Sequence, residues 1–228
     1  MTQLVATRQS LHAVAEQVLA PALHHATGRI GLRAAPGGFA TPWFPIDGGG
    51  ERRIRVDGTD IVVETRGAGE EDLLREPLTT LRAAAAFIGI EPGAPAGVYR
   101  PATTLSPDVP LVLDPRAAAD LARFFAAGDE ALAQFAAELP SPLPVAQLWP
   151  EHFDLGISAE EINYGASPGD DAHDEPYFYV GPWSRPPSEA FWNESFGASL
   201  TWEQAGDVAG AVELFREGRA HALGPLSD

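Results

Sequence analysis

Apolar residues recur every three or four positions in several stretches of the chain, and this spacing predicts helices. The first predicted helix follows Ser10, carries an apolar stripe that includes Val14 and Val18, and ends at Gly28. Pro21 is expected to kink it, because a proline ring cannot donate a hydrogen bond to the preceding turn. The other predicted helices span residues 77–88, 115–127, 129–139 and 202–222.

Between these helices, apolar and polar residues alternate in two regions, which predicts strands, since successive side chains of a strand face opposite ways. In the first region, residues 53–56 and 60–64 flank Asp57-Gly58, a pair that suits a tight hairpin turn. The second region lies within residues 147–183. Because turns separate the strands, we expect an α+β fold in which two antiparallel β regions pack against helices. The helix–strands–helix order recurs in both halves, and a duplicated plan is therefore a hypothesis.

A proline-rich segment, residues 91–115, lies between the two halves. This composition is typical of a linker, while apolar residues such as Val98 and Leu111 favour packing of the segment against a surface. A chain of 228 residues can form one large domain or two small ones. We expect a single α+β domain over residues 1–228, with a sub-boundary in the proline-rich segment.

Two residue types are missing from the sequence, and each absence excludes a class of chemistry. The chain has no cysteine, which excludes disulfides, iron–sulfur clusters and Cys-ligated zinc. All 15 basic residues are arginine. There is consequently no lysine to anchor pyridoxal phosphate or to serve a phosphate-binding loop. A divalent metal stays open as a cofactor.

Acidic residues outnumber basic residues by 32 to 15, which gives a formal net charge of −17 at pH 7. The acidic excess is concentrated in residues 67–228, and such a surface repels nucleic acid and anionic membranes. No apolar run approaches the roughly 18–20 residues that span a bilayer, and the N-terminus lacks the layout of a signal peptide. We therefore expect a cytoplasmic protein, and the sequence leaves its oligomeric state open.

Residues 147–183 are the chemically richest stretch, with two histidines, eight acidic residues and three tyrosines but no basic residue. The alternation in residues 151–157 predicts a strand with an apolar face toward the core and His152 and Asp154 on the opposite face. Residues two apart on a strand lie about 6.5–7 Å apart, so both side chains can reach one bound atom. The pair is our first candidate for a catalytic or metal-binding site.

If the strands that follow pair as a meander, the same surface gains further polar side chains. We expect it to present Asn163, Tyr177 and Tyr179 as ligand-binding residues. The loop before Tyr177 would lie at its rim and contribute His173 and Glu175. A slip of one residue in strand register would invert the faces and disperse this set.

Two kinds of chemistry suit these residues. His152, Asp154 and His173 make up a two-histidine, one-carboxylate ligand set for a divalent metal. Without a metal, His152 or His173 could act as a general acid or base, oriented by Asp154 or Glu175. We thus expect a small-molecule pocket on the polar face of the 147–183 strands, with metal-assisted catalysis as one form. The alternative is a non-catalytic binding or protein-interaction module, and whether the chain is an enzyme stays open.

Four stretches resemble a family of uncharacterised bacterial proteins of the actinobacterial type, described as a domain of unknown function. The resemblance extends over most of the chain, which implies that the chain is one module, and it implies no reaction, cofactor or catalytic residue. The resembling segments are LWPEHFDL (148–155), NYGASPGDDAHDEPYFYVGPW (163–183), TGRIGLRAAPGGFATP (27–42) and PLTTLRAAAAFIG (77–89).

Overall fold

The computed structural model describes residues 2–67, 72–140, 144–184 and 189–223, and it has an α+β fold with two antiparallel sheets, as predicted. The chain divides into two compact units. The N-terminal unit comprises Met1–Arg123 and Leu148–Phe153, and the C-terminal unit comprises Phe124–Gln147 and Asp154–Asp228. The first sheet lies in the N-terminal unit, and the second lies in the C-terminal unit except for Leu148 and Trp149.

The N-terminal unit begins with a helical stretch of three parts: α1 (Gln3–Val14), the π-helical turn η1 (Ala15–Leu19) and α2 (Ala20–Thr27). The helix begins well before Ser10, because the Thr2 side chain caps it by accepting from the Val5 amide. The π-helical turn ends at Leu19, two residues before Pro21, and the helical stretch continues through the proline as α2. The predicted end is correct, since Gly28 closes α2 in the left-handed conformation at φ 73°.

The first sheet has the strand order β1-β2-β4-β5-β6, and the short β3 pairs with β4 alone. The hairpin predicted around Asp57-Gly58 is present as β4 and β5. A strand, β6, and the cap Thr80 precede the next helix, so the prediction of a helix opening at Pro77 is wrong. The elements are β1 (Arg33–Ala35), β2 (Gly38–Ala40), β3 (Phe44–Pro45), β4 (Glu51–Asp57), β5 (Asp60–Arg66), β6 (Asp72–Pro77) and α3 (Leu81–Ile88).

Strand β6 forms one edge of this sheet, and all six of its residues are exposed. They include Leu73 and Leu74, which are 55% and 52% exposed. The strand thus places two exposed leucines among charged residues at a sheet edge, where main-chain donors and acceptors face outward.

The proline-rich segment lies within the N-terminal unit and is tied to the first helix by side chains. The carboxylate of Glu16, which has no exposed surface, accepts hydrogen bonds from the Ala102 amide and from the amide and hydroxyl of Thr103. Ser10 and Thr7 accept from the amides of Val112 and Asp114. Burial raises the pKa of Glu16, and the hydrogen bonds from Thr103 and Ala102 partly offset this rise.

Helix α4 (Pro115–Ala136) follows, and its start agrees with the prediction. The Asp114 carboxylate accepts from the Ala117 amide at 2.8 Å, and Pro115 occupies the first helical position. The predicted break at Gly128 is absent. Gly128 instead allows the helix to pack closely on the second sheet, because a Cβ at this position would lie 2.6 Å from the Cβ of Ala166.

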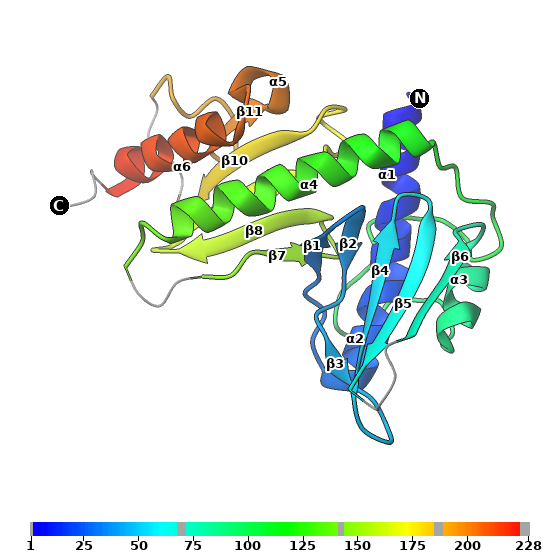
Figure 1. The fold of residues 1–228 in the computed structure, drawn as a ribbon. Helices are drawn as coiled ribbons and strands as arrows, with labels where there is room; N and C mark the ends of the chain where they lie inside the picture. Colours follow the sequence, from blue (N-terminus) through cyan, green and yellow to red (C-terminus); the bar gives the residue numbers. More distant parts are fainter. Residues whose placement is uncertain (1, 68–71, 141–143, 185–188, 224–228) are drawn as a thin grey trace. The chain divides into compact units, whose positions relative to one another are not determined.

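The second sheet is a meander of order β11-β10-β9-β8-β7, and β7, at one edge, includes one of the three points where the chain passes between units. Figure 1 shows α4 and α6 along this sheet. Its apolar face buries a cluster of rings, those of Phe135, Tyr164, Phe178 and Phe215. The elements are β7 (Gln147–Trp149), β8 (Asp154–Ala159), β9 (Ile162–Ser167), β10 (Tyr177–Pro182), β11 (Ala198–Thr201), α5 (Trp202–Ala205) and α6 (Val208–Leu223).

In the described parts of the chain, no helix combines the length and apolar character needed to cross a bilayer.

Candidate functional site

The register of the second sheet brings four of the predicted site residues onto one face. Tyr179 on β10 pairs with Gly165 on β9, and Gly165 pairs with Gly156 on β8. Two residues before Tyr179, Tyr177 pairs with Ser167. Asp154 precedes Gly156 by two residues, and Asn163 precedes Gly165 by two. Since side chains two apart share a face, Asp154, Asn163, Tyr177 and Tyr179 all lie opposite the buried ring cluster.

The two glycines make room for Tyr179 to lie across the sheet. A Cβ on Gly165 would come within 2.3 Å of the Tyr179 ring, whereas one on Gly156 would lie 3.5 Å from the Tyr179 hydroxyl. The hydroxyl donates a hydrogen bond to Oδ2 of Asp154. Burial raises the pKa of Tyr179 well above its usual value, and the charge of Asp154 adds to the rise. Tyr179 is therefore a protonated donor at neutral pH and not a base.

A second network forms around Asp170 in the loop before β10. Its carboxylate accepts from the Tyr177 hydroxyl at 2.6 Å and from the amides of Ala172 and His173 at 2.7 and 2.9 Å. The His173 ring lies between two carboxylates, with Nδ1 3.3 Å from Asp170 and Nε2 3.1 Å from Glu194. Glu194 also accepts from the hydroxyl of Ser199 at 3.0 Å.

The ionisation of this network follows from its contacts. Burial acts to raise the pKa of Asp170, but the hydrogen bonds from Tyr177, Ala172 and His173 outweigh burial and lower it. Burial acts to lower the pKa of His173, but the hydrogen bonds to Glu194 and Asp170 outweigh burial and raise it. A protonated imidazole can donate from both nitrogens, so the cationic form of His173 can bridge the two carboxylates.

The predicted strand over residues 151–157 is present only from Asp154 onward, as part of β8, so His152 does not share a strand face with Asp154. His152 is exposed in a turn between β7 and β8, where its amide and that of Phe153 donate to the Trp149 carbonyl. Phe153 has φ 58°, and its ring stacks on His12 at 5.0 Å. This left-handed residue breaks the alternation on which the common face depended.

The remaining predicted ligand-binding residues lie apart from the His173 network. Asn163 is exposed, and its Oδ1 accepts from Ser158 at 2.7 Å and from the indole of Trp183 at 3.0 Å. Glu175 is exposed in the loop before β10. Within the described residues, no three histidine, aspartate or glutamate side chains are grouped so that they could hold one metal ion.

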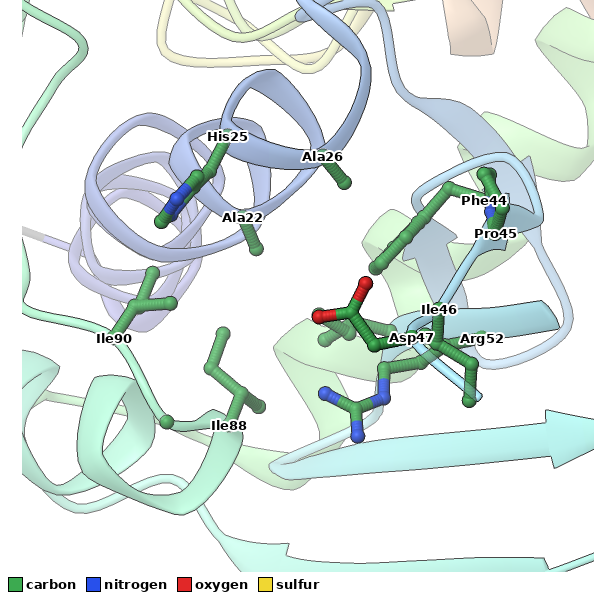
Figure 2. A pocket seen from close by; sticks show the side chains of 12 residues that line it. Ala22, His25, Ala26, Phe44, Pro45, Ile46, Asp47, Arg52, Ile88 and Ile90 are labelled. Carbon is green, nitrogen blue, oxygen red and sulfur yellow. The ribbon is translucent and has the colours of Figure 1, made fainter. Parts of the chain in front are cut away.

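A pocket that the sequence did not predict lies within the N-terminal unit. Its volume is about 730 Å³, and its walls come from α2, the hairpin of β3 and β4, and the end of α3 (Figure 2). Eight of the lining residues are apolar, and three side chains bring polar groups: His25, Asp47 and Arg52. The apolar lining comprises Ala22, Ala26, Phe44, Pro45, Ile46, Ile54, Ile88 and Ile90.

Strand alternation explains why a charged side chain reaches this pocket. Arg52 shares the inward face of β4 with Ile54 and Val56, which are 1% and 0% exposed. The outward arginines of the same strand have partners, since Arg53 and Arg55 donate to Glu64 at 2.6 and 2.8 Å.

Arg52 differs from these neighbours. Its Nε atom is buried and has no hydrogen-bond partner among the described residues. In the sequence, the only sign of this is that Arg52 falls at the alternating positions of β4 that otherwise hold the buried residues Ile54 and Val56. The pocket itself could not be predicted, because its walls lie far apart in the sequence.

No protein-family model, curated protein or solved structure matches this chain, so the resemblance noted in the sequence stays a prediction.

Proposed function

We propose that the protein binds a small organic molecule in the N-terminal pocket, and that Arg52 receives an anionic group of this ligand. The buried, unpartnered Nε of Arg52 supports this most directly. A buried donor without a partner destabilises a fold by about 1–3 kcal/mol. An acceptor supplied by a ligand would remove that cost. Arginine suits the role because its planar guanidinium can bind a carboxylate through two parallel hydrogen bonds.

The size and lining of the pocket support an organic ligand rather than an inorganic anion. A volume of about 730 Å³ lies within the range of roughly 300–1,000 Å³ that is typical of small-molecule sites. Phe44 and Ile54 form apolar wall on the strand side, and Ile88 and Ile90 form it on the helix side. A ligand with an apolar body and one anionic end would match both features.

Calorimetric titration with 3-phenylpropanoate and with octanoate tests the proposal. We expect saturable binding of at least one of them to the wild-type protein and at least a tenfold weaker affinity in Arg52→Gln. Arg53→Gln is the matched control, because it removes the same charge from the outward face of β4. The proposal fails if neither carboxylate binds. It also fails if the two variants lose affinity equally.

A second candidate function is acid–base chemistry on the polar face of the C-terminal sheet, which the sequence predicted. The hydrogen-bonded pairs Tyr179–Asp154 and Tyr177–Asp170 support it, together with His173, whose pKa is raised by its hydrogen bonds to Glu194 and Asp170. Such a site would use His173 as a proton donor and the tyrosine hydroxyls to orient a substrate. Screening esters and sugar derivatives for turnover that Tyr179→Phe and His173→Gln both abolish would test it.

A further inference from the structure

We infer that the ligand of the N-terminal pocket is an α-amino acid with a large apolar side chain, an inference that rests on the proposed function of this pocket. A second charged group, Asp47, lines the same cavity as Arg52. In Figure 2 the carboxylate of Asp47 and the guanidinium of Arg52 both extend from the strand hairpin toward the space in front of α2 and α3. The pocket thus carries an anion receptor and a cation receptor.

The local backbone places both charges at one end of the cavity. Phe44 pairs directly with Arg52 across β3 and β4, so their side chains share a face. The tight turn that joins these strands is closed by hydrogen bonds from the Ile46 amide to the Gly50 carbonyl and from Gly49 back to Ile46, both at 3.3 Å. Asp47 lies in this turn and is therefore held close to the start of β4.

The two charges do not neutralise each other. In the described part of the chain, Asp47 and Arg52 form no ion pair with one another, although both border the same space. A gap between a carboxylate and a guanidinium can accept a group that carries both charges. The ammonium of an α-amino acid would face Asp47, and its carboxylate would face Arg52.

Ligands with a single charge fit this arrangement less well. A simple carboxylate would meet attraction from Arg52 but repulsion from Asp47, and a simple amine would meet the reverse. In a partly buried site, a close pair of unit charges interacts strongly enough to change affinity by tenfold or more. Of these three classes, only the zwitterion gains from both side chains.

The rest of the lining defines the side chain that the ligand carries. Ile46, Ile88 and Ile90 border the cavity along with Phe44, and α2 contributes the small residues Ala22 and Ala26. Small residues on one wall leave room for a bulky group opposite them. An aromatic or branched aliphatic side chain would bury the most apolar surface there, at about 25 cal/mol per Å².

Calorimetric titration of the whole protein with three matched probes tests this inference: L-phenylalanine, 3-phenylpropanoate, which lacks the ammonium, and 2-phenylethylamine, which lacks the carboxylate. We expect L-phenylalanine to bind at least tenfold more tightly than either analogue. Asp47→Asn should remove the preference for L-phenylalanine over 3-phenylpropanoate, and Arg52→Gln should weaken both. Glu51→Gln controls for lost charge, because Glu51 adjoins Arg52 and pairs with Arg66 in an exposed bridge.

The outcomes separate this inference from the proposed function. If 3-phenylpropanoate binds as tightly as L-phenylalanine and depends on Arg52, the pocket binds carboxylates and the inference fails alone. If none of the three probes binds but octanoate does, the inference fails alone. If octanoate does not bind either, or if 2-phenylethylamine binds best, both the inference and the proposed function fail. An equal response of Asp47→Asn and Glu51→Gln would also overturn the assignment of Asp47.

Discussion

The network around Asp170 and the N-terminal pocket differ in how their charges are satisfied. In the network, Asp170 accepts hydrogen bonds from Tyr177 and from the amides of Ala172 and His173, and the His173 ring contacts two carboxylates. In the N-terminal pocket, Arg52 has a buried nitrogen without a partner. A network that satisfies its own groups needs no ligand, whereas unmatched charges at a cavity favour one. If the proposed function holds, lack of partners is a better guide to the binding site of this protein than abundance of polar residues.

The largest change in stability is expected from a substitution that tests how closely Tyr179 packs on the C-terminal sheet. Gly165→Ala would place a Cβ against the Tyr179 ring, so we expect a loss of about 1–3 kcal/mol in the free energy of unfolding. Gly156→Ala is the matched control, because its Cβ would lie at ordinary contact distances. Chemical denaturation measures both. If Tyr179 is the cause, the penalty of Gly165→Ala should disappear in a Tyr179→Ala background.

The next effect concerns the carboxylate at the centre of the network. Asp170→Asn removes a charged acceptor that serves Tyr177, Ala172 and His173, and we expect a loss of about 1 kcal/mol. The loss should be at the low end of the usual range because the Asp170 side chain is 43% exposed. The exposed neighbour Asp171 provides the control. An equal change in the melting temperature of Asp171→Asn would show that net charge, not the network, is responsible.

The pH dependence of the free energy of unfolding should reflect the protonation of His173. Because its folded pKa is raised, its stabilising effect is complete below the unfolded value of about 6.5 and is lost as pH rises through the folded pKa. Asp170, whose pKa is lowered, contributes above about pH 4 and loses its effect on further acidification. Unfolding free energies from pH 5 to 9 should thus decline less in His173→Gln than in the wild type. Parallel curves would contradict this account.

The smallest expected effect has the opposite sign. Arg52→Met removes a buried, unpartnered nitrogen, so in the absence of ligand it should leave stability unchanged or raise it by up to about 1 kcal/mol. Arg53→Met should destabilise by about 1 kcal/mol, since it removes the hydrogen bond to Glu64 and the stacking over Trp43. Thermal unfolding of the two variants compares an unpaired with a paired arginine on one strand. Equal destabilisation would mean that Arg52 is satisfied.

Much of the fold could be predicted because it depends on local sequence. Asp57-Gly58 marked the hairpin, Asp114-Pro115 marked the start of α4, and Gly28 marked the end of α2. The errors arose where tertiary packing or main-chain geometry prevailed. Gly128 does not break α4, since its lack of a side chain allows close approach to Ala166, and Phe153 turns the chain in a left-handed conformation.

The candidate sites were predictable to different degrees for the same reason. The face that carries Asp154, Tyr177 and Tyr179 follows from strand alternation within one short segment. The pocket around Arg52 draws on α2, the β3–β4 hairpin and α3, and no local pattern reports that these meet. Only the folded chain shows which charge lacks a partner.

The open edge of β6 has a consequence for handling the protein in solution. Leu73 and Leu74 offer a ready template for another strand, while a net charge of −17 pushes separate copies apart. Salt shortens the range of that repulsion from about 30 Å at 0.01 M to about 3 Å at 1 M. Concentrated stocks should therefore stay clear in dilute buffer and cloud as ionic strength rises, and replacing Leu74 with glutamate should delay the clouding.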